Sequence, residues 1–155
     1  MDTQLTEIFG RNRLVNDLLQ SDVEVATPVR DRGIDLIAYL DLDEQADRFM
    51  AIPIQIKTAA RRAFTIDRKY AKFQNLLMAF VWGIERPETA TIYAVSYPEF
   101  MVIGGEMGWL ETASWIDGGR YTTTAPSKRL LELLASYEVR PGAWNARITS
   151  ALRAS

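Results

Sequence analysis

The chain has 155 residues, of which 48% are hydrophobic and 25% are charged, a balance typical of globular proteins that excludes intrinsic disorder. It contains no cysteine and no histidine, which excludes disulfides, thiolate nucleophiles, Ser-His triads and zinc sites built on these side chains. Any metal must therefore have oxygen ligands, which favours magnesium, calcium or manganese. The formal net charge of −2 gives no overall indication of nucleic-acid binding.

The size and the hydropathy pattern predict one compact domain over residues 1–155. No apolar run reaches the roughly 18 residues that a membrane span needs. The polar and acidic start, MDTQLTEIFG, lacks the basic and then apolar pattern of a signal peptide. We therefore expect a cytoplasmic protein with no membrane partner.

The first predicted element is a helix over residues 4–20, which Asp2 or Thr3 can cap. Apolar side chains recur in it at three- and four-residue spacing and predict a buried stripe. The members of this stripe are Leu5, Ile8, Phe9, Val15, Leu18 and Leu19.

Three predicted strands follow, over residues 23–29, 33–42 and 50–58. The polar stretch DEQAD, residues 43–47, predicts a turn that joins the second and third strands as an antiparallel hairpin. The second strand, which begins with Gly33 and Asp35, is apolar on both faces, so we expect it to be central in the sheet.

The second half of the chain alternates between predicted helices and strands. A short basic helix over residues 67–75 precedes strands at 76–84 and 90–97. Pro98 suits the start of a helix that the glycine pair at 104–105 would end. A loop with a small hairpin is expected over 108–124, then helices over 125–137 and 141–153, with Leu130, Leu131, Leu133, Leu134 and Tyr137 on the buried face of the first.

The hairpin brings polar side chains of two strands together. Period-two alternation in IPIQIK places Ile52, Ile54 and Ile56 on one face. Gln55 and Lys57 then share the other face, with their Cα atoms roughly 7 Å apart. Antiparallel pairing sets the start of one strand beside the end of the other, so we expect Asp35 to meet both.

Such a cluster can bind a hard cation and act on a phosphate. Asp35, the side-chain oxygen of Gln55 and the backbone carbonyl of Ile56 are suitable ligands for a divalent ion. The ion would lower the pKa of a bound water and neutralise charge on a phosphate. Lys57 would orient the attacking water and stabilise the transition state electrostatically.

These residues resemble the motif of the PD-(D/E)XK nuclease superfamily, which includes restriction endonucleases and some homing endonucleases. The resemblance is carried by GID, by QIK about 20 residues later, and by Glu7 in the preceding helix. It implies an α/β fold with an αβββαβ core over residues 4–84, in which helices flank a mixed central sheet. Residues 85–155 would be a C-terminal elaboration with additional helices.

The resemblance also implies roles for individual residues. Asp35 occupies the place of the family's first metal-binding aspartate, Gln55 that of its acidic residue, and Lys57 that of the motif lysine. Glu7 corresponds to a helix glutamate that some branches add to the metal site, and Asp31 is a substitute ligand. Magnesium or manganese is the implied cofactor, and DNA and a second copy of the chain are the implied partners.

The sequence departs from the family pattern at two positions. Ile34 replaces the motif proline, which many members also lack. Gln55 replaces a carboxylate, which keeps one oxygen ligand but removes a negative charge. The resemblance then implies weaker magnesium binding, or one metal ion instead of two.

Basic residues follow the motif lysine closely. Between residues 57 and 72 there are six cationic side chains and one acidic side chain, Asp67. Such a run is either a solvated surface or a track for the phosphates of DNA. The candidate contacts are Arg61, Arg62, Lys69, Lys72 and Gln74.

Three functions agree with these observations. The first is a metal-dependent nuclease that hydrolyses DNA phosphodiester bonds. The second is a non-catalytic nucleic-acid-binding or protein-interaction module whose metal site is degraded at Gln55. The third is a small partner protein or immunity factor unrelated to nucleic acid.

Each site residue also has a purely structural interpretation. Asp35 can accept hydrogen bonds from backbone N–H groups near the turn. Lys57 can protect a sheet edge from aggregation, and Gln55 can simply be solvated. Glu7 can pair with Arg11 one helical turn later. All four tryptophans, at positions 82, 109, 115 and 144, are expected to pack in the core.

Overall fold

The computed structural model describes residues 2–40 and 49–154, and its centre is a five-stranded sheet in the order β1-β2-β3-β5-β6. Neighbouring strands are antiparallel except β3 and β5, which are parallel, so the sheet is mixed. A separate antiparallel pair is formed by β4 and β7. The strands are β1 Val23–Ala26, β2 Leu36–Leu40, β3 Met50–Ala59, β4 Phe64–Asp67, β5 Leu77–Trp82, β6 Thr91–Ser96 and β7 Arg120–Thr123.

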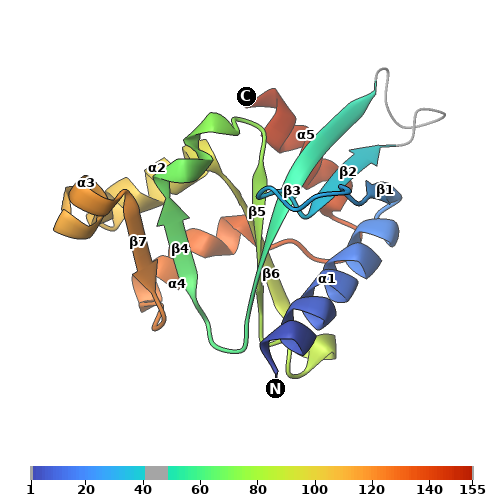
Figure 1. The fold of residues 1–155 in the computed structure, drawn as a ribbon, viewed down its shortest axis with the longest axis horizontal. Helices are drawn as coiled ribbons and strands as arrows, with labels where there is room; N and C mark the ends of the chain where they lie inside the picture. Colours follow the sequence, from blue (N-terminus) through green and yellow to red (C-terminus); the bar gives the residue numbers. More distant parts are fainter. Residues whose placement is uncertain (1, 41–48, 155) are drawn as a thin grey trace.

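Helices cover both faces of the central sheet (Figure 1). One face carries α1 and α5, and the other carries α2, α3 and α4 together with the β4–β7 pair. The helices are α1 Thr3–Leu19, α2 Tyr97–Glu106, α3 Ala113–Gly118, α4 Lys128–Leu134 and α5 Trp144–Arg153, and the 3-10 turns are η1 Arg68–Lys72, η2 Pro87–Thr89, η3 Trp109–Glu111 and η4 Ala135–Tyr137. The predicted α/β class, with a mixed sheet flanked by helices, is confirmed.

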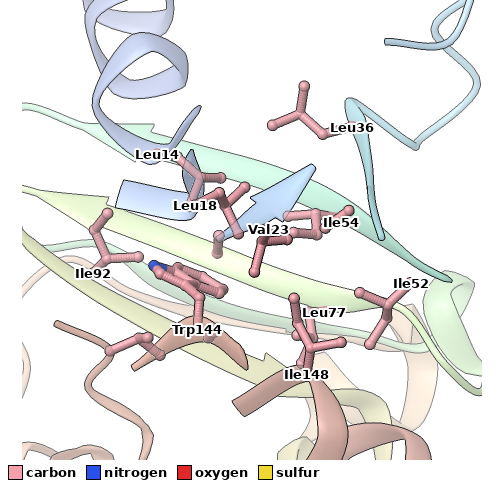
Figure 2. Packing of buried hydrophobic residues seen from close by; sticks show 14 of the residues in the cluster. Leu14, Leu18, Val23, Leu36, Ile52, Ile54, Leu77, Ile92, Trp144 and Ile148 are labelled. Atoms are coloured by element: carbon pink, nitrogen blue, oxygen red, sulfur yellow. The ribbon is translucent and has the colours of Figure 1, made fainter. Parts of the chain in front are cut away.

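The two faces of the sheet have cores of different composition. The core under α1 and α5 is mostly aliphatic, and Figure 2 shows Leu14 and Leu18 of α1 beside Trp144 of α5 over the strands. The opposite core is rich in aromatic rings, and the rings of Phe64 and Phe80 lie 4.6 Å apart between their centroids. All four tryptophans are buried, as predicted. Strand β5 alternates between the two cores and is buried along its whole length.

Helix α1 buries a different face from the predicted one. Asp2 caps it as expected, because its side chain accepts a hydrogen bond from the backbone N–H of Gln4. However, Leu5, Ile8, Phe9 and Leu19 are between 41% and 52% exposed. The line that faces the sheet is Thr6, Gly10, Leu14, Asp17 and Leu18.

The reason is a close contact between Gly10 of α1 and the side chain of Thr58 in β3. A Cβ atom on Gly10 would lie 2.0 Å from Oγ1 of Thr58, so no larger residue fits there without a shift. The absence of a side chain at Gly10 thus sets the rotation of the helix, against the apolar pattern.

Several other predictions need correction. The basic helix predicted over residues 67–75 is shorter and of a different type: β4 ends at Asp67, and the 3-10 helix η1 follows over Arg68–Lys72. The strand that Asp35 precedes is not central, since β2 is second and β3 takes the middle position. Helix α2 continues through the glycine pair at 104–105 and ends at Glu106.

The region 108–124 contains more regular structure than the expected loop. It holds η3, α3 and β7, and β7 pairs with β4 instead of forming a local hairpin. The helix expected over 125–137 is shorter, as α4 and the turn η4. The predicted hairpin of β2 and β3 is confirmed, whereas its turn at 43–47 lies outside the described residues. In the two described ranges, no helix has the length and apolarity to cross a bilayer.

Candidate metal and nucleic-acid site

The candidate site lies where strand β3 changes partner. Strand β2 pairs with residues 50–54 of β3, and β5 pairs with residues 54–59. In the described ranges no strand pairs with this edge of β3 beyond Ile54, so the edge is open there. Asp35 stands at this step, directly before β2, and its N–H donates to the carbonyl of Ile54 at 2.9 Å.

The carboxylate of Asp35 closes the first open position of β3. Its Oδ2 accepts hydrogen bonds from the backbone N–H of Ile56 and from Nε2 of Gln55, each at 2.6 Å. Asp35 and Gln55 therefore meet, and the Asp35 side chain is only 11% exposed. The backbone contact also supports the structural interpretation of Asp35, because it satisfies a donor that has lost its strand partner.

Gln55 presents its amide nitrogen to Asp35. The same Nε2 also donates to the carbonyl of Ile56 at 3.3 Å. As a cation ligand Gln55 would use its oxygen, so its terminal amide would have to rotate by half a turn. The side chain is well buried, since Gln55 is only 8% exposed.

A polar cleft of about 310 Å³ opens beside this step. Helix α1 forms one wall with Glu7 and Arg11, which lie one turn apart. The contact of Gly10 with Thr58 holds this part of α1 against β3. The full lining is Glu7, Arg11, Asp31, Asp35, Gln55, Ile56, Lys57 and Thr58.

Lys57 and Glu7 both line the cleft, and both are exposed. In residues 2–40 and 49–154, no carboxylate lies within 4.0 Å of the Lys57 ammonium group. The alternative pair of Glu7 with Arg11 is not formed. Arg11 instead approaches Oδ1 of Asp35 at 3.8 Å.

The donor set of the cleft fits a hard cation. Three carboxylates, from Glu7, Asp31 and Asp35, line it together with the Gln55 amide and the Ile56 backbone. Oxygen ligands of this kind suit magnesium or manganese. Within the described ranges, no three acidic side chains lie close enough together to hold a metal ion. The side chains of the cleft would therefore have to move toward one another to bind it. Asp31 is held by its own turn, where Oδ1 accepts from the N–H of Gly33 at 3.0 Å.

The predicted nucleic-acid contacts fall into two groups at opposite ends of β4. Arg61 and Arg62 are exposed in the connection from β3. Lys69, Lys72 and Gln74 are exposed at or beyond η1. The short strand β4 lies between the two groups and separates them (Figure 1).

Contacts within each basic group are weak or local. Lys69 pairs with Asp67 at 3.8 Å, and Gln74 donates to the carbonyl of Ala71 at 2.9 Å. Arg62 borders a second hollow of about 420 Å³, lined also by Trp82 and Tyr93. Burial and the nearby Glu138 raise the pKa of Tyr93, and the positive charge of Arg62 opposes this rise.

Sequence reasoning did not find Arg11 and Thr58 as parts of the site. Arg11 follows Glu7 by four residues, a spacing that places both on one helical face. That signal was present, but it indicated only a local ion pair. The role of Thr58 depends on its contact with Gly10, which joins positions far apart in the sequence and leaves no local pattern.

Comparisons with known proteins relate this chain by its fold. No family model matches the sequence, and no curated protein matches it. Among solved structures, the chain is similar to the bacterial homing endonuclease I-Ssp6803I, with a TM-score of 0.50 and 15% sequence identity. The alignment covers 98% of this chain and 95% of the endonuclease. The protein therefore has the mixed α/β fold of a homing endonuclease over nearly its whole length.

Proposed function

We propose that the protein is a metal-dependent nuclease of the PD-(D/E)XK type that hydrolyses DNA phosphodiester bonds. One observation carries the proposal: Glu7, Asp35, Gln55 and Lys57 line a single cleft at the step in β3. The sequence motif predicted this grouping. A fold shared with a homing endonuclease supports the same conclusion.

Within this proposal, each residue has a distinct task. Asp35, Glu7, the Gln55 amide oxygen and the Ile56 carbonyl would hold magnesium or manganese, with Asp31 as a further carboxylate. The ion would supply a water of lowered pKa and neutralise charge on the phosphate. Lys57, which no carboxylate neutralises in the described residues, is free to orient the water and to stabilise charge on the phosphate oxygens.

The DNA would pass the cleft along the basic side chains that leave β3. Arg61 and Arg62 follow Lys57 by four and five residues and carry exposed charges. Lys69, Lys72 and Gln74 lie farther along, beyond β4. Because guanidinium and ammonium groups bind phosphate oxygens without reading the bases, these contacts would position DNA without specifying its sequence.

Replacement of Lys57 by alanine tests the proposal. We expect wild type to cut plasmid, single-stranded or branched DNA with magnesium or manganese, and chelation of the metal to stop it. Lys57→Ala should cut about 100- to 1,000-fold more slowly, which is the usual loss when one group that stabilises transition-state charge is removed. Its thermal unfolding should stay unchanged, since Lys57 is exposed.

A matched control is Lys128→Ala. Lys128 is 92% exposed at the start of α4 and should leave cleavage as in wild type. If folded wild-type protein leaves every substrate intact with both metals, the nuclease proposal is wrong.

A second candidate function is a non-catalytic DNA-binding module on the same fold. The orientation of Gln55 favours it, because the amide nitrogen and not an oxygen faces Asp35. This function predicts DNA binding that weakens with salt, as phosphate contacts are screened, and that needs no metal. Calorimetric titration with manganese and with DNA separates it from the nuclease.

A homodimer is part of the nuclease proposal, because two copies would cut the two strands of a duplex. We therefore expect twice the monomer mass in solution when DNA is present. Light scattering of the protein with and without a short duplex measures this mass directly, and a single copy on the duplex would contradict the expectation.

A further inference from the structure

The two oxygens of Asp35 have different surroundings. Oδ2 accepts two hydrogen bonds of 2.6 Å, from Gln55 and from the backbone of Ile56, and is thereby fixed. Among the residues that the structure describes, Oδ1 has only the guanidinium of Arg11 near it, at 3.8 Å, which is too long for a hydrogen bond. Oδ1 is therefore the oxygen of Asp35 that is open to another positive charge.

Arg11 has a fixed backbone and a side chain that is exposed at its end. Its helix is locked beside β3, since even one carbon atom added at Gly10 would overlap Thr58. The Arg11 side chain is 42% exposed in the cleft and makes one loose ion pair there. A long side chain on a rigid base can change partners without any movement of the fold.

We propose that Arg11 is a displaceable counter-ion of Asp35, which leaves Oδ1 when a divalent cation binds and then contacts a DNA phosphate. This inference rests on the proposed nuclease function and adds a substrate-binding residue to it. A cation at Asp35 repels the guanidinium, because two positive charges cannot share one carboxylate at low cost. The planar guanidinium fork matches two phosphate oxygens, which gives the released side chain a partner in the same cleft.

The proposal predicts opposite changes in two measurements on Arg11→Ala. Manganese should bind about tenfold more tightly without DNA, because a competing positive charge is gone from a half-exposed site. Cleavage at saturating manganese should fall by about 100-fold, because a charged contact with the phosphate is lost. A residue with a merely structural role would not improve metal binding.

Two further variants complete the experiment. Arg11→Lys keeps the charge but loses the fork, so its manganese affinity should stay near wild type while cleavage is partly reduced. Arg153→Ala removes an exposed arginine at the end of α5 and should alter neither measurement. Calorimetric titration gives the affinities, and thermal melting confirms that each variant folds.

Each outcome decides between the two proposals. If manganese affinity is unchanged or weaker in Arg11→Ala, Arg11 is not a counter-ion that competes with the metal. If cleavage is unchanged in Arg11→Ala, Arg11 does not contact the DNA phosphate. If wild type cuts no DNA but Arg11→Ala binds manganese more tightly, the nuclease fails while the counter-ion stands. If neither protein binds manganese, both proposals are wrong.

Discussion

The two halves of β3 differ in both their partner and their polarity. In the sheet that the structure describes, residues 50–53 pair with β2 alone and residues 55–59 pair with β5 alone. Ile54 pairs with both strands. In the first half Ile52 is completely buried, whereas in the second half Lys57 is exposed and Gln55 bonds to Asp35.

This contrast shows how a strand that changes its partner can create a polar site at its open edge. Strand β2 stops pairing with β3 at Ile54, and β5 pairs with the opposite edge of β3 from there on. Among the described residues, one edge of β3 therefore has no strand partner in the middle of the domain. The bare N–H of Ile56 then needs an acceptor, and the Asp35 carboxylate provides it. The space left by the missing strand is the cleft that α1 lines with Glu7 and Arg11.

Of the changes that distinguish the two halves of β3, we expect Ile52→Ala to have the largest effect, which is on the stability of the fold. Ile52 is fully buried in the aliphatic core, so its truncation leaves a cavity and should lower the free energy of unfolding by about 2–5 kcal/mol. Denaturant unfolding followed by fluorescence measures this change. Manganese affinity of the remaining folded protein should not change.

The matched control is Ile37→Ala on the adjacent strand β2. Ile37 is 36% exposed and pairs with Pro53, so we expect a loss below about 1 kcal/mol. Equal losses of unfolding free energy in Ile52→Ala and Ile37→Ala would mean that Ile52 is packed no better than the partly exposed Ile37.

The local pattern of the sequence predicted both halves of β3 well. Alternation placed Ile52 and Ile54 in the core, and it set Gln55 on the opposite side of the strand. The hairpin with β2 brought Asp35 beside Gln55, because the start of one antiparallel strand lies beside the end of the next. Whether these residues act in catalysis is still a prediction.

Features that depend on distant partners were not predictable in this way. The segment 64–67 is a strand because β7 pairs with it, and Thr65 bonds to Thr122, which lies 57 residues later. Nothing in the short basic sequence around Asp67 indicates that partner. The rotation of α1 likewise follows from a contact with β3 and not from its apolar stripe.

A smaller effect is expected from Gly10→Ala, which tests how α1 is attached to the second half of β3. The new Cβ would overlap Thr58, so helix or strand must shift, and overpacking of this kind costs about 1–3 kcal/mol. Cleavage should fall as well, because Glu7 and Arg11 move with the helix. Thr58→Ala in the same protein should recover part of the stability, which a double-mutant cycle measures.

The control for this variant is Gly105→Ala in α2. A Cβ there meets no atom within 4 Å, and alanine favours a helix over glycine by about 0.5–1 kcal/mol. The control should therefore be neutral or more stable. A Gly10→Ala protein as stable as this control would show that α1 is not held by close contact.

We expect the smallest effect on stability from Gln55→Glu, which adds a second carboxylate to the polar half of β3. A glutamate at this position would face the Asp35 carboxylate, and two like charges at hydrogen-bond distance repel each other in the metal-free protein. We expect a loss of about 1 kcal/mol in stability without metal.

Manganese should reverse that loss, because the added carboxylate is a charged oxygen ligand that needs no amide rotation. We expect about tenfold tighter manganese binding than in wild type, and a larger rise in melting temperature on adding the metal. Gln74→Glu makes the same chemical change at an exposed position beyond η1 and should produce neither response. If Gln55→Glu binds manganese no better than Gln74→Glu, the cation does not lie between Asp35 and position 55. Asp35 would then serve only to accept the hydrogen bonds of Gln55 and of the open edge of β3.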